Sequence, residues 1–222
     1  MNKGRSQHNL RAPAGVGSAS GKVEQSRQLI LASGSPRRVE LLKNLGLKFE
    51  VMPSSIEEKI DPHLEPPELV VGLAVAKARA VAGRAPAAGR ALVLGADTVV
   101  VIDGSIIGKP ESREQAVEML SRLSRRCHEV FTGVALVESS GLVLSTGYEV
   151  SRVYMRLIDA REMEAYVDTG EPMDKAGAYA LQGIGSAFVE RIEGCFTNII
   201  GLPVPLVVRL LRGAGVPVLG TT

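Results

Sequence analysis

The sequence predicts an α/β domain that is built on a mixed β-sheet. Apolar, β-branched runs typical of strands alternate along the chain with segments that show helical spacing. Some of the strands are joined by hairpin signals, which make neighbours antiparallel, and others by helical crossovers, which parallel strands need. With 222 residues, of which 45% are hydrophobic and 23% charged, the chain is long enough for one large domain or two small ones.

The N-terminal third predicts two strands and two helices. An apolar run at residues 29–31 is the first strand. A helix follows from Pro36, which suits a first helical turn because no hydrogen bond is lost with its missing N–H. Residues 48–52 alternate like a second strand, residues 53–67 form a polar loop, and helical spacing covers residues 68–81.

The next segment predicts a hairpin. Residues 91–102 are a strongly β-branched run, interrupted in composition by Gly-Ala-Asp-Thr at residues 95–98, and predict a strand. The Asp-Gly pair at residues 103–104 predicts a tight turn into a strand at residues 105–107. The other expected elements are a helix capped by Ser112 and running through Leu123, strands near residues 129–137 and 142–157, a helix at 159–167, a strand at 187–192 and a last helix at 204–211.

Residues 1–27 differ from the rest because they are rich in Ser, Gly, Asn, Gln and basic residues and show no hydrophobic period. We expect a disordered leader, followed by one domain at residues 28–215. The segment lacks the apolar core of a secretory signal. Its Arg residues and its few acids leave an organelle transit peptide or a cloning remnant open.

The composition of the chain limits which classes of partner it can bind and which compartment it fits. A net charge of +2 and an aromatic content of 4% argue against a nucleic-acid surface. No apolar run approaches the roughly 18 residues that a membrane span requires, so we expect a cytoplasmic protein without a membrane partner. Two cysteines that form no paired motif fit a reducing compartment. The three histidines lack ligand spacing, so a divalent metal would rest on carboxylates.

Residues 33–38 (SGSPRR) predict an anion site. Ser35 is at the expected N-cap of the helix that begins at Pro36, and the free N–H groups of a first helical turn attract anions. Arg37 and Arg38 add guanidinium groups that suit phosphate. An ordinary first turn with solvated arginines is the alternative.

Asp97 is the candidate catalytic carboxylate. It lies in the middle of the most apolar predicted strand, where burial of an unpaired carboxylate is costly. We expect it to be paired, bound to a metal or facing a cleft, and an Asp that caps a local bend is the alternative. Together with the two arginines, Lys77 and Lys109 provide the four cations that a triphosphate needs, although either lysine alone is more typical of a solvated surface.

Residues 170–179 are dense in glycine and charge, as is typical of loops that line sites. Gln182 follows them, and its amide offers a donor and an acceptor to a base edge.

A series of ordered motifs between residues 28 and 211 resembles the Maf (septum formation inhibitor) family of nucleoside triphosphate pyrophosphatases. The motifs are SGSPRR-x-ELL at 33–42, GADTVV at 95–100, GKP at 108–110, FTGV at 131–134, GEP-x-DKAGAY at 170–179, QG at 182–183 and GLP at 201–203. Ala180 and Leu181 depart from the Gly and Ile that are usual before this Gln, which leaves the shape of the pocket in doubt.

The resemblance implies an elongated mixed sheet with flanking helices, like that of the inosine triphosphate pyrophosphatases, with two lobes around a cleft. It implies hydrolysis to the monophosphate and pyrophosphate with a divalent metal, usually Mg²⁺, with Mn²⁺ as the alternative. Asp97 resembles the catalytic proton acceptor of the family. Arg37, Thr98 and Gln182 resemble the residues that mark the branch acting on dTTP and UTP, whereas the other branch prefers 7-methylguanosine triphosphate.

From the motifs and the charges together, we expect a pyrophosphatase for dTTP and UTP, with modified pyrimidine nucleotides as further candidates. The residues expected around the phosphates are Ser33, Ser35, Arg38, Lys77 and Lys109. Asp97, with Glu58, is expected to hold the metal or to orient the attacking water, and the sequence does not divide these roles. A regulator of cell division that senses triphosphates without turnover, and a nucleic-acid-binding module, are the alternatives, and a homodimer stays open.

Overall fold

A computed structural model describes residues 27–56, 63–85 and 91–220. In this part of the chain, seven strands form one mixed sheet in the order β2-β1-β3-β5-β6-β7, with β4 paired to β3. The strands are β1 (Leu29–Leu31), β2 (Glu50–Val51), β3 (Leu92–Ile102), β4 (Ser105–Ile107), β5 (Cys127–Glu138), β6 (Val143–Met155) and β7 (Val189–Glu193). β1 is parallel to β2 and β3, and the remaining pairs are antiparallel. The predicted mixed sheet is therefore confirmed.

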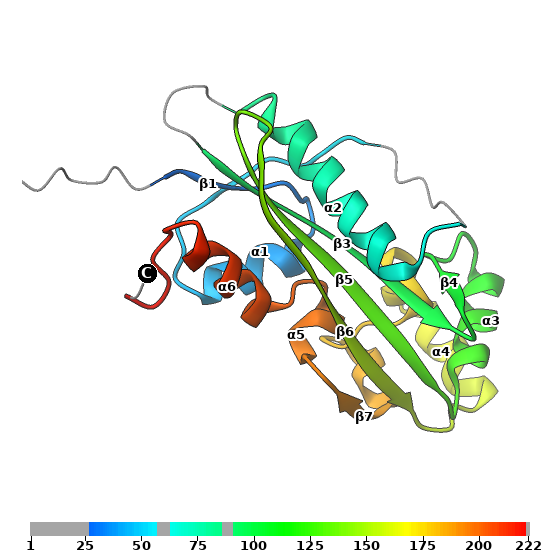
Figure 1. Ribbon diagram of the computed structural model, residues 1–222. Coiled ribbons are helices and arrows are strands. Elements are labelled where there is room, and N and C mark those ends of the chain that lie inside the picture. The colour runs from blue at the N-terminus through cyan, green and yellow to red at the C-terminus, as the bar shows by residue number, and fades with distance from the viewer. Residues whose placement is uncertain (1–26, 57–62, 86–90, 221–222) are drawn as a thin grey trace, which may run out of the picture.

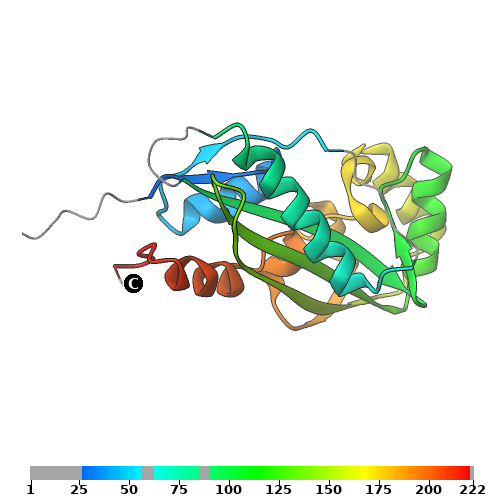
Figure 2. The same cartoon turned by 45° about the horizontal axis from the view of Figure 1, so that its top comes forward.

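Helices cover both faces and one end of this sheet (Figure 1). They are α1 (Pro36–Asn44), α2 (Pro66–Ala82), α3 (Arg113–Leu123), α4 (Ala160–Asp168), α5 (Phe196–Ile200) and α6 (Val204–Gly213), with 3-10 turns η1 (Glu171–Asp174), η2 (Ala176–Ala178) and η3 (Ile184–Phe188). α2 lies along β3 and β5 on one face, whereas α1, α5 and α6 lie on the other (Figures 1 and 2). α3 and α4 gather at the end of the sheet near β4.

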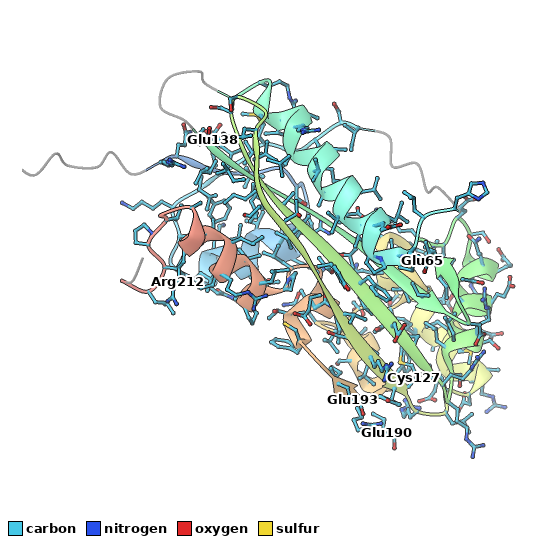
Figure 3. All side chains as sticks on the ribbon, viewed as in Figure 1. Glu65, Cys127, Glu138, Glu190, Glu193 and Arg212 are labelled. Carbon is cyan, nitrogen blue, oxygen red and sulfur yellow. The ribbon has the colours of Figure 1, made fainter. Side chains whose placement is uncertain are left out.

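The long central strands set the length of the molecule. Cys127 and Glu138, which begin and end β5, lie toward opposite ends of the sheet (Figure 3). One buried apolar cluster includes Leu31 and Leu94 at the α1 and α6 end, and another includes Val100 at the α3 and α4 end. The two clusters therefore meet β3 on either side of its middle.

α2 lies directly on the backbone of the sheet. A Cβ atom added at Gly95 of β3 would lie 2.2 Å from the carbonyl oxygen of Ala74, and one added at Gly133 of β5 would lie 2.3 Å from the backbone of Val70. Only glycine permits so close an approach. This contact fixes α2, and with it Lys77, over the middle of β3.

The middle of β3 has one open edge. On that edge β3 pairs with β1 over residues 92–94 and with β4 over residues 100–102, so residues 95–99 have no partner strand there among the described residues. The other edge pairs with β5 along nearly its whole length. The opening lies just beyond the carboxyl end of β1, the usual place for a ligand site in sheets with parallel strands.

Most predicted elements are confirmed, and two details were wrong. β3 runs without a break through residues 95–98, because those residues stay paired with β5. β2 has two residues, fewer than the expected 48–52. The short helix α5 was not predicted. Ser112 caps α3 as expected by accepting a hydrogen bond from the Gln115 N–H at 3.2 Å.

Part of the sequence interpretation lies outside the described residues. This applies to residues 1–26 of the expected leader and to Glu58, so the leader, its boundary with the domain and the role of Glu58 stay predictions. Across the described ranges, no helix is long and apolar enough to cross a membrane.

Candidate active site

A cavity of about 400 Å³ lies at the open edge of β3. Its volume is within the range of pockets that hold small ligands. The turn between β1 and α1, the middle of β3, the segment after β4 and the chain from η1 to residue 182 all line it. Five cationic side chains and two carboxylates are among the described lining residues: Arg37, Arg38, Lys77, Lys109, Lys175, Asp97 and Asp174. An excess of positive charge suits an anionic ligand.

Asp97 and Lys77 form a buried ion pair at one wall of this cavity. Lys77 Nζ lies 2.6 Å from Asp97 Oδ1, and the two residues are only 6% and 4% exposed. Asp97 points to the α2 face because it is paired with Gly133, whose Cα faces α2. The expectation that Asp97 is paired or at a cleft is confirmed on both counts, and the bend that it would cap is not present.

Thr98, the next residue of β3, points to the opposite face, because successive side chains of a strand alternate. Its hydroxyl lies 2.9 Å from that of Thr132, which donates to the carbonyl oxygen of Asn198 at 3.1 Å. The Asn198 amide in turn donates to the carbonyl oxygen of Val130 at 2.9 Å and to Ser151 Oγ at 3.0 Å. This buried chain of hydrogen bonds fixes Thr98 at the cavity.

Arg38 connects three parts of the site. Its guanidinium donates to the carbonyl oxygen of Gly201 at 2.7 Å, to Ser33 Oγ at 3.2 Å and to Thr98 Oγ1 at 3.0 Å. Ser35 is at the N-cap of α1, as expected, but its side chain makes no capping hydrogen bond. The structure therefore brings Ser33, Ser35 and Arg38 to the cavity and gives Arg38 an additional part in holding the walls together.

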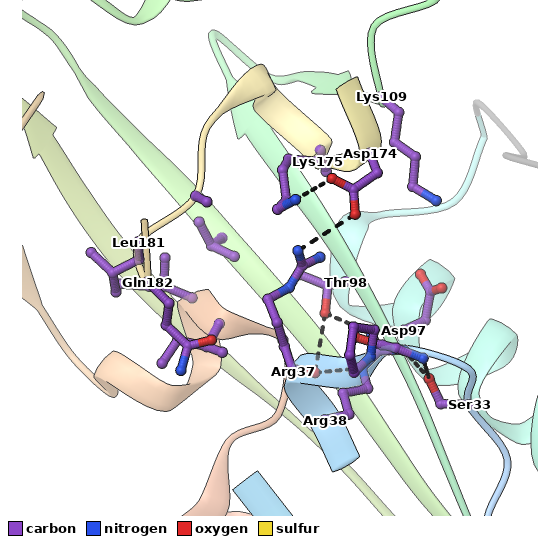
Figure 4. A pocket seen from close by; sticks show the side chains of 18 of the residues that line it. Ser33, Arg37, Arg38, Asp97, Thr98, Lys109, Asp174, Lys175, Leu181 and Gln182 are labelled. Atoms are coloured by element: carbon purple, nitrogen blue, oxygen red, sulfur yellow. Dashed lines mark hydrogen bonds and ion pairs between the residues drawn. The ribbon is translucent and has the colours of Figure 1, made fainter. Parts of the chain in front are cut away.

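Arg37 reaches across the cavity toward η1 (Figure 4). Its Nη1 lies 3.8 Å from Asp174 Oδ2, and Asp174 also pairs with Lys175. Burial acts to raise the pKa of Asp174, but the Lys175 ammonium and the Arg37 guanidinium together hold that pKa below its usual value. Lys109 is exposed at the rim. Lys175 was not among the predicted site residues, although the charge-dense segment that contains it was singled out.

The remaining wall is uncharged. Ala180, Leu181 and Gln182 line the cavity, and Gln182 is exposed to it. In Figure 4, Leu181 and Gln182 lie apart from Lys109, Asp174 and Lys175. Val100, Val130 and Ile199 give part of the lining an apolar character. The cavity thus combines a cationic side with a side that carries one neutral amide.

Within the described ranges, no three or more His, Cys, Asp and Glu side chains gather as a metal site. Of the lining residues that the structure describes, Asp97 is the buried carboxylate. Glu58, the other predicted metal ligand, lies outside the described residues.

The fold and the site define an anion-binding α/β protein whose cavity separates a cationic from a neutral side. A family model described as Maf-like protein matches residues 28–214, so the chain belongs to the Maf family. A dTTP/UTP pyrophosphatase of Caldicellulosiruptor saccharolyticus is 45% identical over 85% of this chain and 96% of the relative. A dTTP/UTP pyrophosphatase of Gloeobacter violaceus is 50% identical over 83% of this chain and 94% of the relative. The resemblance inferred from the motifs is confirmed.

Proposed function

We propose that this chain hydrolyses dTTP and UTP to the nucleoside monophosphate and pyrophosphate. The observation that carries the proposal is the buried Asp97 at the open edge of β3, facing a cavity otherwise rich in cations. Relatives that are 45% to 50% identical over most of their length carry the name dTTP/UTP pyrophosphatase. Fold and chemistry therefore point to the same reaction.

The triphosphate is assigned to the cationic side. Phosphoryl transfer requires positioning and neutralisation of anionic oxygens and little covalent work from the protein. Arg37, Lys109 and Lys175 line the cavity, where they can take phosphate oxygens, and the first turn of α1 adds free N–H groups. A bound triphosphate competes with Asp174 for Arg37, because the 3.8 Å ion pair occupies the guanidinium.

Asp97 accepts the proton of the water that attacks the α-phosphorus. Lys77 has a different role from the phosphate contact expected from the sequence. Its ammonium, 2.6 Å from Asp97 Oδ1, favours the ionised carboxylate and fixes its orientation. A base that is buried and still ionised needs such a partner.

The base is assigned to the neutral side. The edge of uracil or thymine presents an acceptor, a donor and an acceptor, and the Gln182 amide can pair with two of these groups. Arg37 and Thr98 also line the cavity and are drawn between Gln182 and Asp97 in Figure 4, and they complete the proposed selectivity set. An edge of the wrong polarity leaves the amide unpaired, which is the basis of discrimination.

A divalent metal fits the site through the chemistry of its donors. Mg²⁺ is commonly bound by one or two carboxylates together with substrate phosphates, and Asp97 supplies the first carboxylate. Glu58 is the proposed second ligand. When bound, Mg²⁺ or Mn²⁺ neutralises charge on the phosphate oxygens. We further propose that the partner is a small-molecule nucleotide and that the chain binds neither nucleic acid nor a membrane. We place it in the cytoplasm, and a homodimer stays open.

A substrate panel tests this function. Pyrophosphate release would be measured for dTTP, UTP, CTP, ATP, GTP and 7-methylguanosine triphosphate. We expect kcat/KM for dTTP and UTP to exceed that for the purine nucleotides by about tenfold or more, because the unmatched edges leave polar groups unpaired. A preference for 7-methylguanosine triphosphate would place the chain in the other branch. Tight binding of UTP without turnover would favour the sensing regulator.

A further inference from the structure

The carboxylate of Glu171 lies under the segment that carries Gln182, but outside the cavity. Glu171 Oε1 accepts hydrogen bonds from the Tyr166 hydroxyl at 2.8 Å and from the Gly185 N–H at 3.1 Å, and Oε2 accepts from the Ile184 N–H at 3.0 Å. A carboxylate that accepts several hydrogen bonds is held in its ionised form. Burial opposes this, but the bonds from Gly185 and Ile184 keep the pKa of Glu171 below its ordinary value.

Tyr166 connects that carboxylate to the other end of the same segment. Its hydroxyl donates to Glu171 and accepts from the Ala180 N–H at 3.1 Å. The ring is 2% exposed and packs edge-on against Phe188, with 5.0 Å between the centroids. Burial, followed by the neighbouring Glu171, raises the pKa of Tyr166, so the hydroxyl keeps the proton that it donates.

The segment between these anchors fits closely on the carboxylate. A Cβ atom at Gly183 would lie 2.3 Å from Glu171 Oε2, and one at Gly185 would lie 2.6 Å from the Tyr166 hydroxyl. Residues 180–185 are therefore anchored by hydrogen bonds at both ends. Leu181 and Gln182, which lie between the anchors, line the cavity.

We infer that Tyr166 and Glu171 are positioning residues for base selectivity, which they control by holding residues 180–185 so that Gln182 meets the pyrimidine edge. Neither residue lines the cavity, so their effect passes through Gln182 and not through direct contact with the substrate. The inference rests on the proposed function and names the residues that hold the base-binding side of the cavity in position. Lys175, on the cationic side, donates to the backbone carbonyl oxygen of Glu171 at 3.2 Å. Substitution of either side chain leaves this bond in place, so phosphate binding is expected to change little.

The test compares Tyr166→Phe with wild type. This substitution removes the hydroxyl and keeps the ring on Phe188. Tyr154→Phe is the matched control, because the Tyr154 hydroxyl also donates to a glutamate, Glu193 at 3.0 Å, but this pair joins β6 to β7 and does not hold residues 180–185. For each protein, kcat and KM are measured with UTP and with CTP, and inhibition constants with UMP and with inorganic tripolyphosphate, which has no base.

We expect Tyr166→Phe to raise KM for UTP and the inhibition constant of UMP by about fivefold or more, because a displaced Gln182 binds the base of both ligands less well. The UTP-to-CTP ratio of kcat/KM should fall by a similar factor, because the amide no longer distinguishes the two base edges. Inhibition by tripolyphosphate should stay within about twofold of wild type. Tyr154→Phe should match wild type throughout. Glu171→Gln, which keeps one acceptor but loses the charge, should change the same quantities in the same direction.

Two results would overturn the inference. One is a Tyr166→Phe variant with the selectivity of wild type, and the other is equal weakening of UMP and tripolyphosphate, which would indicate a general loss of structure. If Tyr166→Phe does not fold, Glu171→Gln decides by the same criteria. A wild type without preference for UTP would instead contradict the proposed function, and the two failures are thus distinguishable.

Discussion

At the scale of single residues, the proposed chemistry depends on one buried carboxylate that is paired with a lysine. Asp97 is 4% exposed and its Oδ1 lies 2.6 Å from the Lys77 ammonium. Removal of a buried partner leaves the other charge poorly compensated, so each member of the pair supports the other. Around this pair, the cavity otherwise offers mainly cations and neutral groups to a ligand.

Asp97→Asn is expected to lower kcat for UTP on the order of 10²-fold or more, the contribution of a positioned proton acceptor. At saturating Mg²⁺, KM should change less than kcat, because most contacts to the phosphates and the base come from other residues. Steady-state assays with UTP provide both constants. Asp103→Asn is the control, since Asp103 is an exposed carboxylate in the turn after β3 that pairs with Arg126. Comparable activity in the two variants would remove Asp97 from the mechanism.

A buried histidine predicts a second residue-scale effect, on stability. His128 is 1% exposed, its Nε2 lies 2.9 Å from the Tyr179 hydroxyl, and burial lowers its pKa from 6.5 to about 4. Above pH 6.5 neither the folded nor the unfolded state protonates this ring. As the pH falls from 6.5 toward 4, only the unfolded state binds the proton, so the free energy of unfolding decreases.

The loss should approach about 3 kcal/mol near pH 4, since each pKa unit corresponds to about 1.4 kcal/mol. Urea unfolding of wild type and of His128→Gln at several pH values between about 7 and about 4 measures it. Other groups titrate equally in both proteins, so the difference isolates His128. Parallel curves for the two proteins would show that His128 is not the group responsible.

At the scale of elements, α2 connects the core to the site. Gly95 of β3 lies under Ala74, which is one turn before Lys77 on the same helix. Any side chain at Gly95 must displace the backbone of α2, because a Cβ there would lie 2.2 Å from a carbonyl oxygen. The position of Lys77 over Asp97 therefore depends on a contact between two backbones.

Gly95→Ala should destabilise the protein by about 2 kcal/mol or more, as overpacking commonly does, and should lower kcat because Lys77 moves with α2. Gly72→Ala is the control, because Gly72 lies on the same helix and has no atom within 4 Å of the place that a methyl group would take. It should be neutral or stabilising by up to about 1 kcal/mol, since alanine favours helix. Thermal unfolding and UTP turnover are measured for both variants. A Gly95→Ala variant with the stability and kcat of wild type would contradict the close contact between α2 and β3.

The elements also show what could be predicted from the sequence. Hydrophobic period and turn residues were enough for most strands and helices, including the Ser112 cap. Gly95 and Asp97 have low strand propensity, but the apolar residues on either side of them predicted one strand, and pairing with β5 keeps β3 extended. Of the site, Asp97 and the cations were identifiable as residue types. The pairing of Asp97 with Lys77 was not, because it depends on how α2 lies on β3.

At the scale of the whole molecule, the cavity lies between two buried clusters that share β3. Leu94 belongs to the cluster at the α1 end and Val100 to the cluster at the α3 end, with the open edge between them. The cavity lining comes from both ends, since Arg37 is on α1 and Lys175 follows η1. A bound nucleotide would contact both ends at once.

We therefore expect a UTP analogue with a non-hydrolysable α,β-bridge to raise Tm. At about 100 times its Kd, a ligand adds about 2.7 kcal/mol of stability, which corresponds to a shift of roughly 5–10 °C for a domain of this size. Thermal unfolding measures the shift, and uridine, which has no phosphates, is the control. An equal shift with uridine would show that the cationic side does not bind the phosphates.

In the proposed reaction, a water activated by Asp97 attacks the α-phosphorus of a pyrimidine nucleoside triphosphate. Turnover of UTP in ¹⁸O-labelled water, with mass analysis of both products, shows which phosphorus the water attacks. We expect UMP that carries one labelled oxygen, and unlabelled pyrophosphate. Label in the pyrophosphate, or release of inorganic phosphate and UDP, would place the attack at another phosphorus and rule out this reaction.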